Sequence, residues 1–196
     1  FQTVAGIIAG GAIANGILQI VNAADQLGDT AQQLNVAAES LQGLRLAAED
    51  FGGSAQGIDK ALGELQKNLG EAVTKGGAAA DAFERIGLSA QDLKNLSVDE
   101  VFFRVATAIS EQATQAERAA LAQEFFGRSG RELVPLLSEG RAGVEALIRS
   151  YRDAGLVLSN ETVGALGDTE RQLRLTKTAV TNLASEIVAG LSPAIR

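Results

Sequence analysis

Apolar residues recur along most of this chain at the spacing of amphipathic helices. In the stretch that begins at residue 24 they stand three or seven positions apart, at Leu27, Leu34, Leu41, Leu44 and Phe51. Such spacing places apolar side chains on one face of a helix. Asn35 interrupts the run, and asparagine is favoured at the N-cap of a helix. We therefore expect two helices, at about 24–33 and 36–51, with Asn35 capping the second.

The same periodicity predicts helices over most of the remaining chain. Four of them are expected at about 55–74, 98–112, 115–126 and 138–154. A short helix is expected to end at Ile86, and a short turn to begin at Ser89. An extended connection at 155–159 then leads into a last helix, which Ser159 or Asn160 is expected to cap. The buried faces of two of them are predicted to hold Ile58, Leu62, Leu65, Leu69 and Val73, and Phe102, Val105 and Ile109. Lys60–Glu64 and Lys67–Glu71 are expected to form exposed i,i+4 ion pairs.

Glycines and capping boxes punctuate these helices. Four glycines are expected to end helices in the left-handed conformation: Gly52, Gly87, Gly127 and Gly155. Three Ser/Thr-x-x-Glu boxes are expected to begin helices: Ser97 with Glu100, Thr114 with Glu117, and Ser129 with Glu132. Pro135 is expected to prevent a long regular continuation. The pattern therefore predicts an all-α fold of many short helices.

The run Phe125–Leu137, FFGRSGRELVPLL, contains a serine that resembles a nucleophile at first sight. A nucleophile elbow needs a second glycine two residues after the serine, and Arg131 stands there. The chain also has no histidine to activate Ser129. We therefore interpret this run as a capped helical corner.

The first 23 residues form an apolar segment without a charged side chain, since the first charge is Asp25. Its core at 4–21 would span about 27 Å as a helix, close to the ~30 Å thickness of a bilayer core. The small and apolar residues Gly6, Ile7, Gly10, Gly16 and Ile17 fit close helix packing or membrane contact. Two interpretations remain open, a membrane-active helix and an apolar helix buried in an oligomer or against a partner.

The last helix carries a half-filled heptad pattern at Leu166, Leu173, Val180 and Ile187. A seam of this kind is typical of a short parallel oligomer or of a helix packed on its own hairpins. We therefore expect three regions: the apolar helix at 1–23, a multi-helix hairpin region at 24–155, and the C-terminal helix at 156–196.

Composition removes several classes of function. The net charge is −7, which disfavours nucleic-acid binding because that requires clustered basic residues. Neither cysteine nor histidine is present, so thiolate and imidazole metal ligands are lacking. We expect no catalytic residue, metal or cofactor, and no enzymatic activity. Methionine is absent even at position 1, and we expect the chain to be part of a longer protein.

Several segments together resemble one known family. They are ADQLGDTAQQLNVAAESLQGLRLAAEDFG (24–52), IDKALGELQKNLGEA (58–72), FERIGLS (83–89), FFGRSGRELVPLL (125–137), GLVLS (155–159) and LASEIVAGLSPAI (183–195). In this order they resemble the tail tape measure proteins of long-tailed phages and of prophage-derived particles, gene transfer agents included. The resemblance extends over about residues 22–195.

The resemblance implies a structural protein that lies in the lumen or tip of a tail tube in the virion or phage-like particle, after synthesis in the bacterial cytoplasm. It implies an elongated helical-hairpin assembly, self-association as a trimer, and contacts with the tail tube protein, the distal tail and hub proteins, assembly chaperones and, transiently, the host membrane during DNA delivery. Two alternatives remain: a membrane-active helical protein and a generic helical interaction domain.

Overall fold

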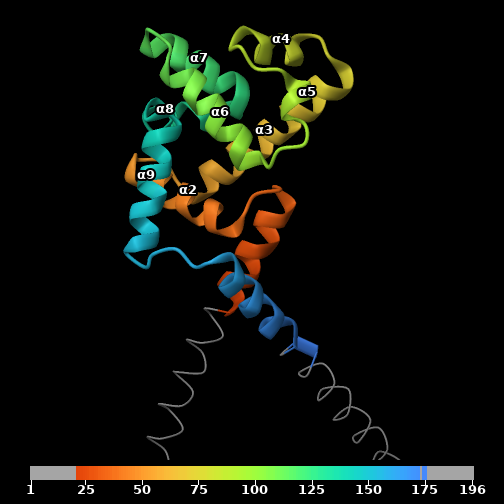
Figure 1. Cartoon of the computed structure of the whole chain (residues 1–196), viewed down its shortest axis with the longest axis vertical. Coiled ribbons are helices and arrows are strands. Elements are labelled where there is room, and N and C mark those ends of the chain that lie inside the picture. Colours follow the sequence, from red (N-terminus) through yellow and green to blue (C-terminus); the bar gives the residue numbers. More distant parts are fainter. Residues whose placement is uncertain (1–20, 173, 176–196) are drawn as a thin grey trace, which may run out of the picture. The chain divides into compact units, whose positions relative to one another are not determined.

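The computed structural model describes residues 21–172, 174 and 175 (Figure 1). Every regular element among these residues is helical, so the predicted all-α class is confirmed. The elements are α2 (Ala38–Asp50), α3 (Ala55–Lys75), α4 (Ala78–Arg85), α5 (Ala90–Leu93), α6 (Val98–Ser110), α7 (Gln115–Phe126), the 3₁₀-helix η1 (Gly127–Arg131), α8 (Val134–Ser138) and α9 (Gly140–Asp153). Residues 21–33 and 160–172 are also helical.

The chain divides into two compact units with boundaries that differ from the three regions expected from the sequence. One unit is Thr30–Asn160, and the other combines Phe1–Asp29 with Glu161–Arg196. In the described part of the second unit, Val21, Ala24 and Leu27 are buried together with Val163. The apolar stripe of helix 21–33 is therefore covered, as its periodicity predicts.

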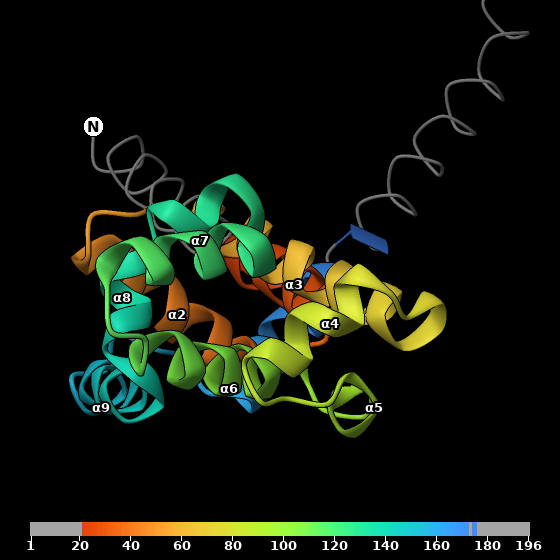
Figure 2. The ribbon, with the colours of Figure 1, turned by 90° about the horizontal axis from the view of Figure 1, so that it is seen from above.

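The core of the Thr30–Asn160 unit is built around α3. Ile58, Leu62 and Leu65 on its apolar face are fully buried, as expected from their spacing. This helix contacts α2, α4, α5, α6, α7 and η1, and it lies among them in Figure 2. Phe102, Val105 and Ile109 of α6 are also fully buried. A single apolar helix face thus organises most of the unit.

Three of the predicted glycine stops end helices in the same way. Gly52, Gly87 and Gly155 have φ of 82°, 73° and 72°, a conformation open mainly to glycine. At Gly87, for example, the following amide of Leu88 donates to the carbonyl of Phe83 at 2.9 Å. This is the Schellman pattern, which satisfies carbonyls that the helix leaves free.

Asn35 is not the N-cap that the sequence suggests. Its φ is 52°, and it ends the preceding helix with the same hydrogen bonds: its amide donates to Gln32, and the Val36 amide donates to Ala31 at 2.9 Å. Asparagine tolerates the left-handed region better than other non-glycine residues. The residue therefore takes the place that glycine has at the other helix ends.

The N-terminus of α2 is capped from a distant part of the chain. Its own N-cap residue, Ala37, makes no side-chain cap. Instead, the side-chain oxygen of Asn160 accepts a hydrogen bond from the amide of Glu39 at 3.0 Å. The sequence predicted Ser159 or Asn160 as the cap of the last helix. It did not reveal this contact, because Glu39 lies over a hundred residues away in the sequence.

The capping boxes have different outcomes. In α7, Thr114 accepts from the amide of Glu117 at 3.2 Å and donates its own amide to the Glu117 carboxylate at 3.0 Å, so this box is present as predicted. Ser97 precedes α6 but makes no side-chain cap, and Glu100 pairs with arginines instead. A cap that was not predicted is Ser54, whose hydroxyl accepts from the amide of Gly57 at 3.1 Å.

The exposed charges of α3 pair in a different register from the predicted one. Lys67 lies 3.3 Å from Glu64, and Lys75 lies 3.3 Å from Glu71. The lysines therefore reach toward the preceding turn, the direction in which helical side chains point. Pairs as exposed as these contribute little to stability.

Helices α2 and α9 approach each other closely at Gly43. A Cβ atom added there would lie 2.7 Å from Cγ2 of Ile148, and Ile148 is itself buried. Gly70 of α3 has nothing within 4 Å of the same ideal position. Only the first of these two helical glycines is therefore required by packing.

We expect Gly43→Ala to destabilise the protein by about 1–3 kcal/mol, because the added methyl group overpacks the crossing. Gly70→Ala is the matched control, and it should stabilise by about 0.5–1 kcal/mol because alanine is the better helix former. Urea unfolding followed by circular dichroism measures both. A stabilising Gly43→Ala would contradict the packing at this crossing.

Candidate functional site

The run Phe125–Leu137 forms a sharp corner in the Thr30–Asn160 unit. Helix α7 ends at Phe126, η1 turns the chain, and α8 follows. Gly127, the predicted stop, has φ 64° and ψ −149°, in a region essentially restricted to glycine. The helix stop at this position is as predicted, although the backbone conformation is not the left-handed helical one.

Two phenylalanines anchor the corner in the core. Phe125 packs edge-on against Phe83 of α4, with ring centroids 4.9 Å apart. Phe126 contacts Phe102 of α6 at 5.5 Å. Aromatic pairs in these geometries are stabilised beyond their buried area. The adjacent phenylalanines thus hold α7 against two different helices.

An amide from α3 caps the C-terminus of α7. The side-chain nitrogen of Asn68 donates to the carbonyl oxygens of Glu124 and Phe125, at 3.1 Å each. These carbonyls belong to the last turn of the helix, where intrahelical donors are lacking. Asn68 was not singled out from the sequence, since nothing local distinguishes it from other polar residues on α3.

The predicted Ser129–Glu132 capping box is wrong. Ser129 lies inside η1, and the Glu132 amide donates to the backbone carbonyl of Ser129 at 3.1 Å rather than to a side chain. The chain winds as a 3₁₀-helix here, so Ser129 is not at a helix start. Pro135 lies in the first turn of α8, where its missing N–H costs nothing, and α8 ends three residues later.

Gly130 is the residue on which the corner depends most closely. A Cβ added to it would lie 2.0 Å from the carbonyl oxygen of Ala122 and 3.0 Å from Cβ of Phe126. Backbone atoms cannot yield as a flexible side chain can. The second glycine of the run therefore serves close backbone contact between η1 and α7.

A charged cluster joins α6 to α9 on the surface of the same unit. Arg141 donates to Glu100 at 2.7 Å and to Glu145 at 2.7 Å, and its guanidinium lies 5.4 Å from the ring centre of Phe103. The hydrogen bond from Arg141, with a further bond from Arg104, holds the pKa of Glu100 below its ordinary value. Glu100 therefore serves a helix–helix contact rather than its predicted box.

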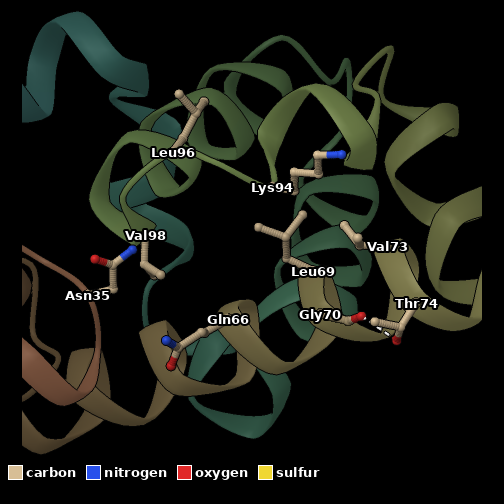
Figure 3. A pocket seen from close by; sticks show the side chains of 9 residues that line it. All are labelled: Asn35, Gln66, Leu69, Gly70, Val73, Thr74, Lys94, Leu96 and Val98. Carbon is tan, nitrogen blue, oxygen red and sulfur yellow. Dashed lines mark hydrogen bonds between the residues drawn. The ribbon is translucent and has the colours of Figure 1, made fainter.

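A groove opens between α3 and the segment that leads from α5 into α6 (Figure 3). Its volume is about 210 Å³. Leu69, Val73, Leu96 and Val98 supply its apolar lining, and Asn35, Gln66, Thr74 and Lys94 supply its polar lining, with Gly70 between them. These residues come from separate parts of the sequence, so local patterns did not reveal the groove.

Other predicted site residues have no assigned place in this geometry. Leu166 is half-buried in the helix 160–172, whereas Leu173, Val180 and Ile187 lie outside the described residues. So do Gly6, Ile7, Gly10, Gly16 and Ile17. Within the described part of the chain, no helix is both long and apolar enough to cross a membrane, and no cluster of acidic residues is arranged to hold a metal ion.

We expect Gly130→Ala to destabilise the protein by about 2–4 kcal/mol, at the upper end of single-residue effects. Ser129→Ala should change stability by less than about 0.5 kcal/mol, because Ser129 caps nothing. Loss of a genuine serine N-cap would cost about 1 kcal/mol. Denaturant unfolding of both variants tests the corner, and a costly Ser129→Ala with a mild Gly130→Ala would contradict it.

Tyr151 provides a spectroscopic report on the α2–α9 contact, because it is the single tyrosine of the chain. Its hydroxyl donates to Asp50. Burial and this hydrogen bond to a carboxylate raise the pKa of Tyr151 to about 12 from 10.0. The folded state thus favours the neutral phenol, and its contribution to stability is present below pH 10 and lost as pH rises toward 12.

We expect the tyrosinate absorbance of the folded protein to appear near pH 12, and that of the denatured protein about two units lower. Asp50→Asn should remove only part of the upward shift in the pKa of Tyr151, because the burial of the phenol remains. Tyr151→Phe should remove this group's share of the stability loss at high pH. Equal tyrosine pKa values in the folded and denatured protein would contradict the contact.

No family model, curated protein or solved structure matches this chain.

Proposed function

We propose that this chain is a structural, non-catalytic segment of a tape-measure-type protein of a phage tail or phage-like particle. The main support for this proposal is the ordered set of segments that resemble this family. FFGRSGRELVPLL at 125–137 is the most specific of these segments. The buried phenylalanines and the close glycine contact give that segment a structural role. This supports a folding signature rather than a reactive site.

The compactness of Thr30–Asn160 refines the proposed role. A helix converts residues to length at 1.5 Å each, but a unit whose helices pack around α3 does not. We infer that this unit is a folded module at the tube end or tail tip, and that other parts of the protein measure length. The expected partners are the tail tube protein, the distal tail and hub proteins, assembly chaperones and further copies of this chain as a trimer.

Membrane contact during DNA delivery belongs to the same proposal. It is assigned to residues 4–21, of which the structure describes only Val21, and it rests on their apolar sequence alone.

An in-frame deletion of residues 30–160 in the particle-forming bacterium tests the proposal. If this unit measured length as one helix, tails would shorten by about 200 Å. We expect a much smaller change, whereas helical residues inserted outside the unit should lengthen tails by about 1.5 Å each. Electron microscopy measures the tails, and mass spectrometry identifies the protein in purified particles.

Absence of the protein from the particles would contradict the tail assignment. A tail length that stays unchanged after the insertion would also contradict it. Shortening by about 200 Å would keep the family assignment but overturn the folded-module role. If the deletion blocks particle assembly, the insertion alone tests the tail assignment, because it leaves the folded unit intact.

A further inference from the structure

Two exposed leucines follow α9 on a segment that is firmly held. We call residues 155–160 the strap. Leu156 and Leu158 are 61% and 37% exposed, whereas Val157 between them is buried. Contiguous exposed apolar surface is a common feature of protein–protein contact sites.

The strap is fixed to α2 by side chains that replace missing backbone partners. The Gln42 side chain donates to the carbonyl of Leu158 at 3.1 Å and accepts from its amide at 3.0 Å. Asn160 adds its bond to Glu39. The leucines are thus held in one orientation, which lowers the entropy cost of binding.

The groove beside α3 has the complementary character. Its volume of about 210 Å³ exceeds the ~150 Å³ of an apolar cavity that accepts benzene. Gly70 in its lining has open space where a side chain would be, although glycine weakens a helix interior. A glycine there permits close approach of another chain. No strap residue lines the groove of its own unit.

The groove and the residue that ends α9 before the strap carry opposite charges. Lys94 stands among the residues that line the groove. Within the described residues its ammonium group donates one hydrogen bond, to Gln91 at 3.3 Å, and forms no ion pair. Asp153 ends α9 just before the strap, is exposed, and has no ion pair within the described part of the chain. Leucines entering the groove would bring an acidic neighbour toward its lysine.

We propose that the strap of one copy docks in the α3 groove of a second copy, with Leu156 and Leu158 as anchors and Asp153 facing Lys94. The contact joins two different surfaces, so it is heterologous, and its repetition closes a ring or extends a row of copies. The patch is small, and such interfaces are transient unless other contacts hold the copies together. The proposal does not depend on the tail assignment.

Directed cross-linking of the full chain tests this contact, with a clean background because the chain has no cysteine. Leu156→Cys protein is mixed with isotope-labelled Val73→Cys protein under mild oxidation, and mass spectrometry counts mixed disulfides. Leu175→Cys is the control, since Leu175 is another exposed leucine, at 65%. We expect the 156–73 pair to form at least about tenfold faster than the 175–73 pair.

Charge reversal provides the second arm. Lys94→Glu in the groove copy should slow the 156–73 cross-link by about tenfold, and Asp153→Lys in the strap copy should restore it. Thr74→Cys, at an exposed neighbouring position, replaces Val73→Cys if that variant unfolds in circular dichroism. A 156–73 cross-linking rate equal to the 175–73 control rate would overturn the proposal. So would a 156–73 rate that neither charge change alters, or a groove occupied only by another protein.

Discussion

Burial of one face of α3 is the constraint on which the Thr30–Asn160 unit depends. Ile58, Leu62 and Leu65 are removed completely from solvent, and each such side chain contributes about 1.5–3 kcal/mol when fully buried. Five other helices and η1 contact α3. Because most of these helices are short, they lack the length to be stable alone. Their stability therefore comes from packing on this shared face.

The corner at Phe125–Leu137 shows how the remaining sequence serves that packing. Its phenylalanines contact α4 and α6, Asn68 of α3 satisfies the last carbonyls of α7, and Gly130 allows η1 to approach the α7 backbone. These residues allow a buried chain to turn sharply. Buried backbone groups without a hydrogen-bond partner would destabilise such a turn. A segment that seemed to offer a serine for chemistry is thus explained by its geometry.

Local patterns predicted much of the helical structure. The expected helix 115–126 matches α7, and 55–74 differs from α3 by one residue. Apolar periodicity, the Thr114–Glu117 box and glycine stops are all read within a few residues, so single-sequence reasoning finds them. This explains why the helix class and most helix ends agree with the structure.

Several of the failures have one physical cause, which is contact between residues distant in sequence. Asn160 caps α2 across a separation of 121 residues, and Asn68 caps α7 across a separation of 56–57 residues. Glu100 forms ion pairs with arginines instead of capping its own helix. Asn35 and Ser129 were assigned from residue type, but neighbouring backbone geometry decides their conformations. The groove was also invisible, since its lining combines residues from α3 with residues on either side of it in the sequence.

Shared packing on α3 is also what separates the proposed folded module from a length-measuring helix. A module unfolds cooperatively, whereas hairpins strung along a tube open one at a time. Native-state hydrogen exchange under mild denaturant tests this difference directly. We predict that amides in α3, α6 and α7 exchange with one common free energy equal to that of global unfolding. Exchange of α3 through a separate, lower-energy opening while α6 and α7 stay protected would contradict the account.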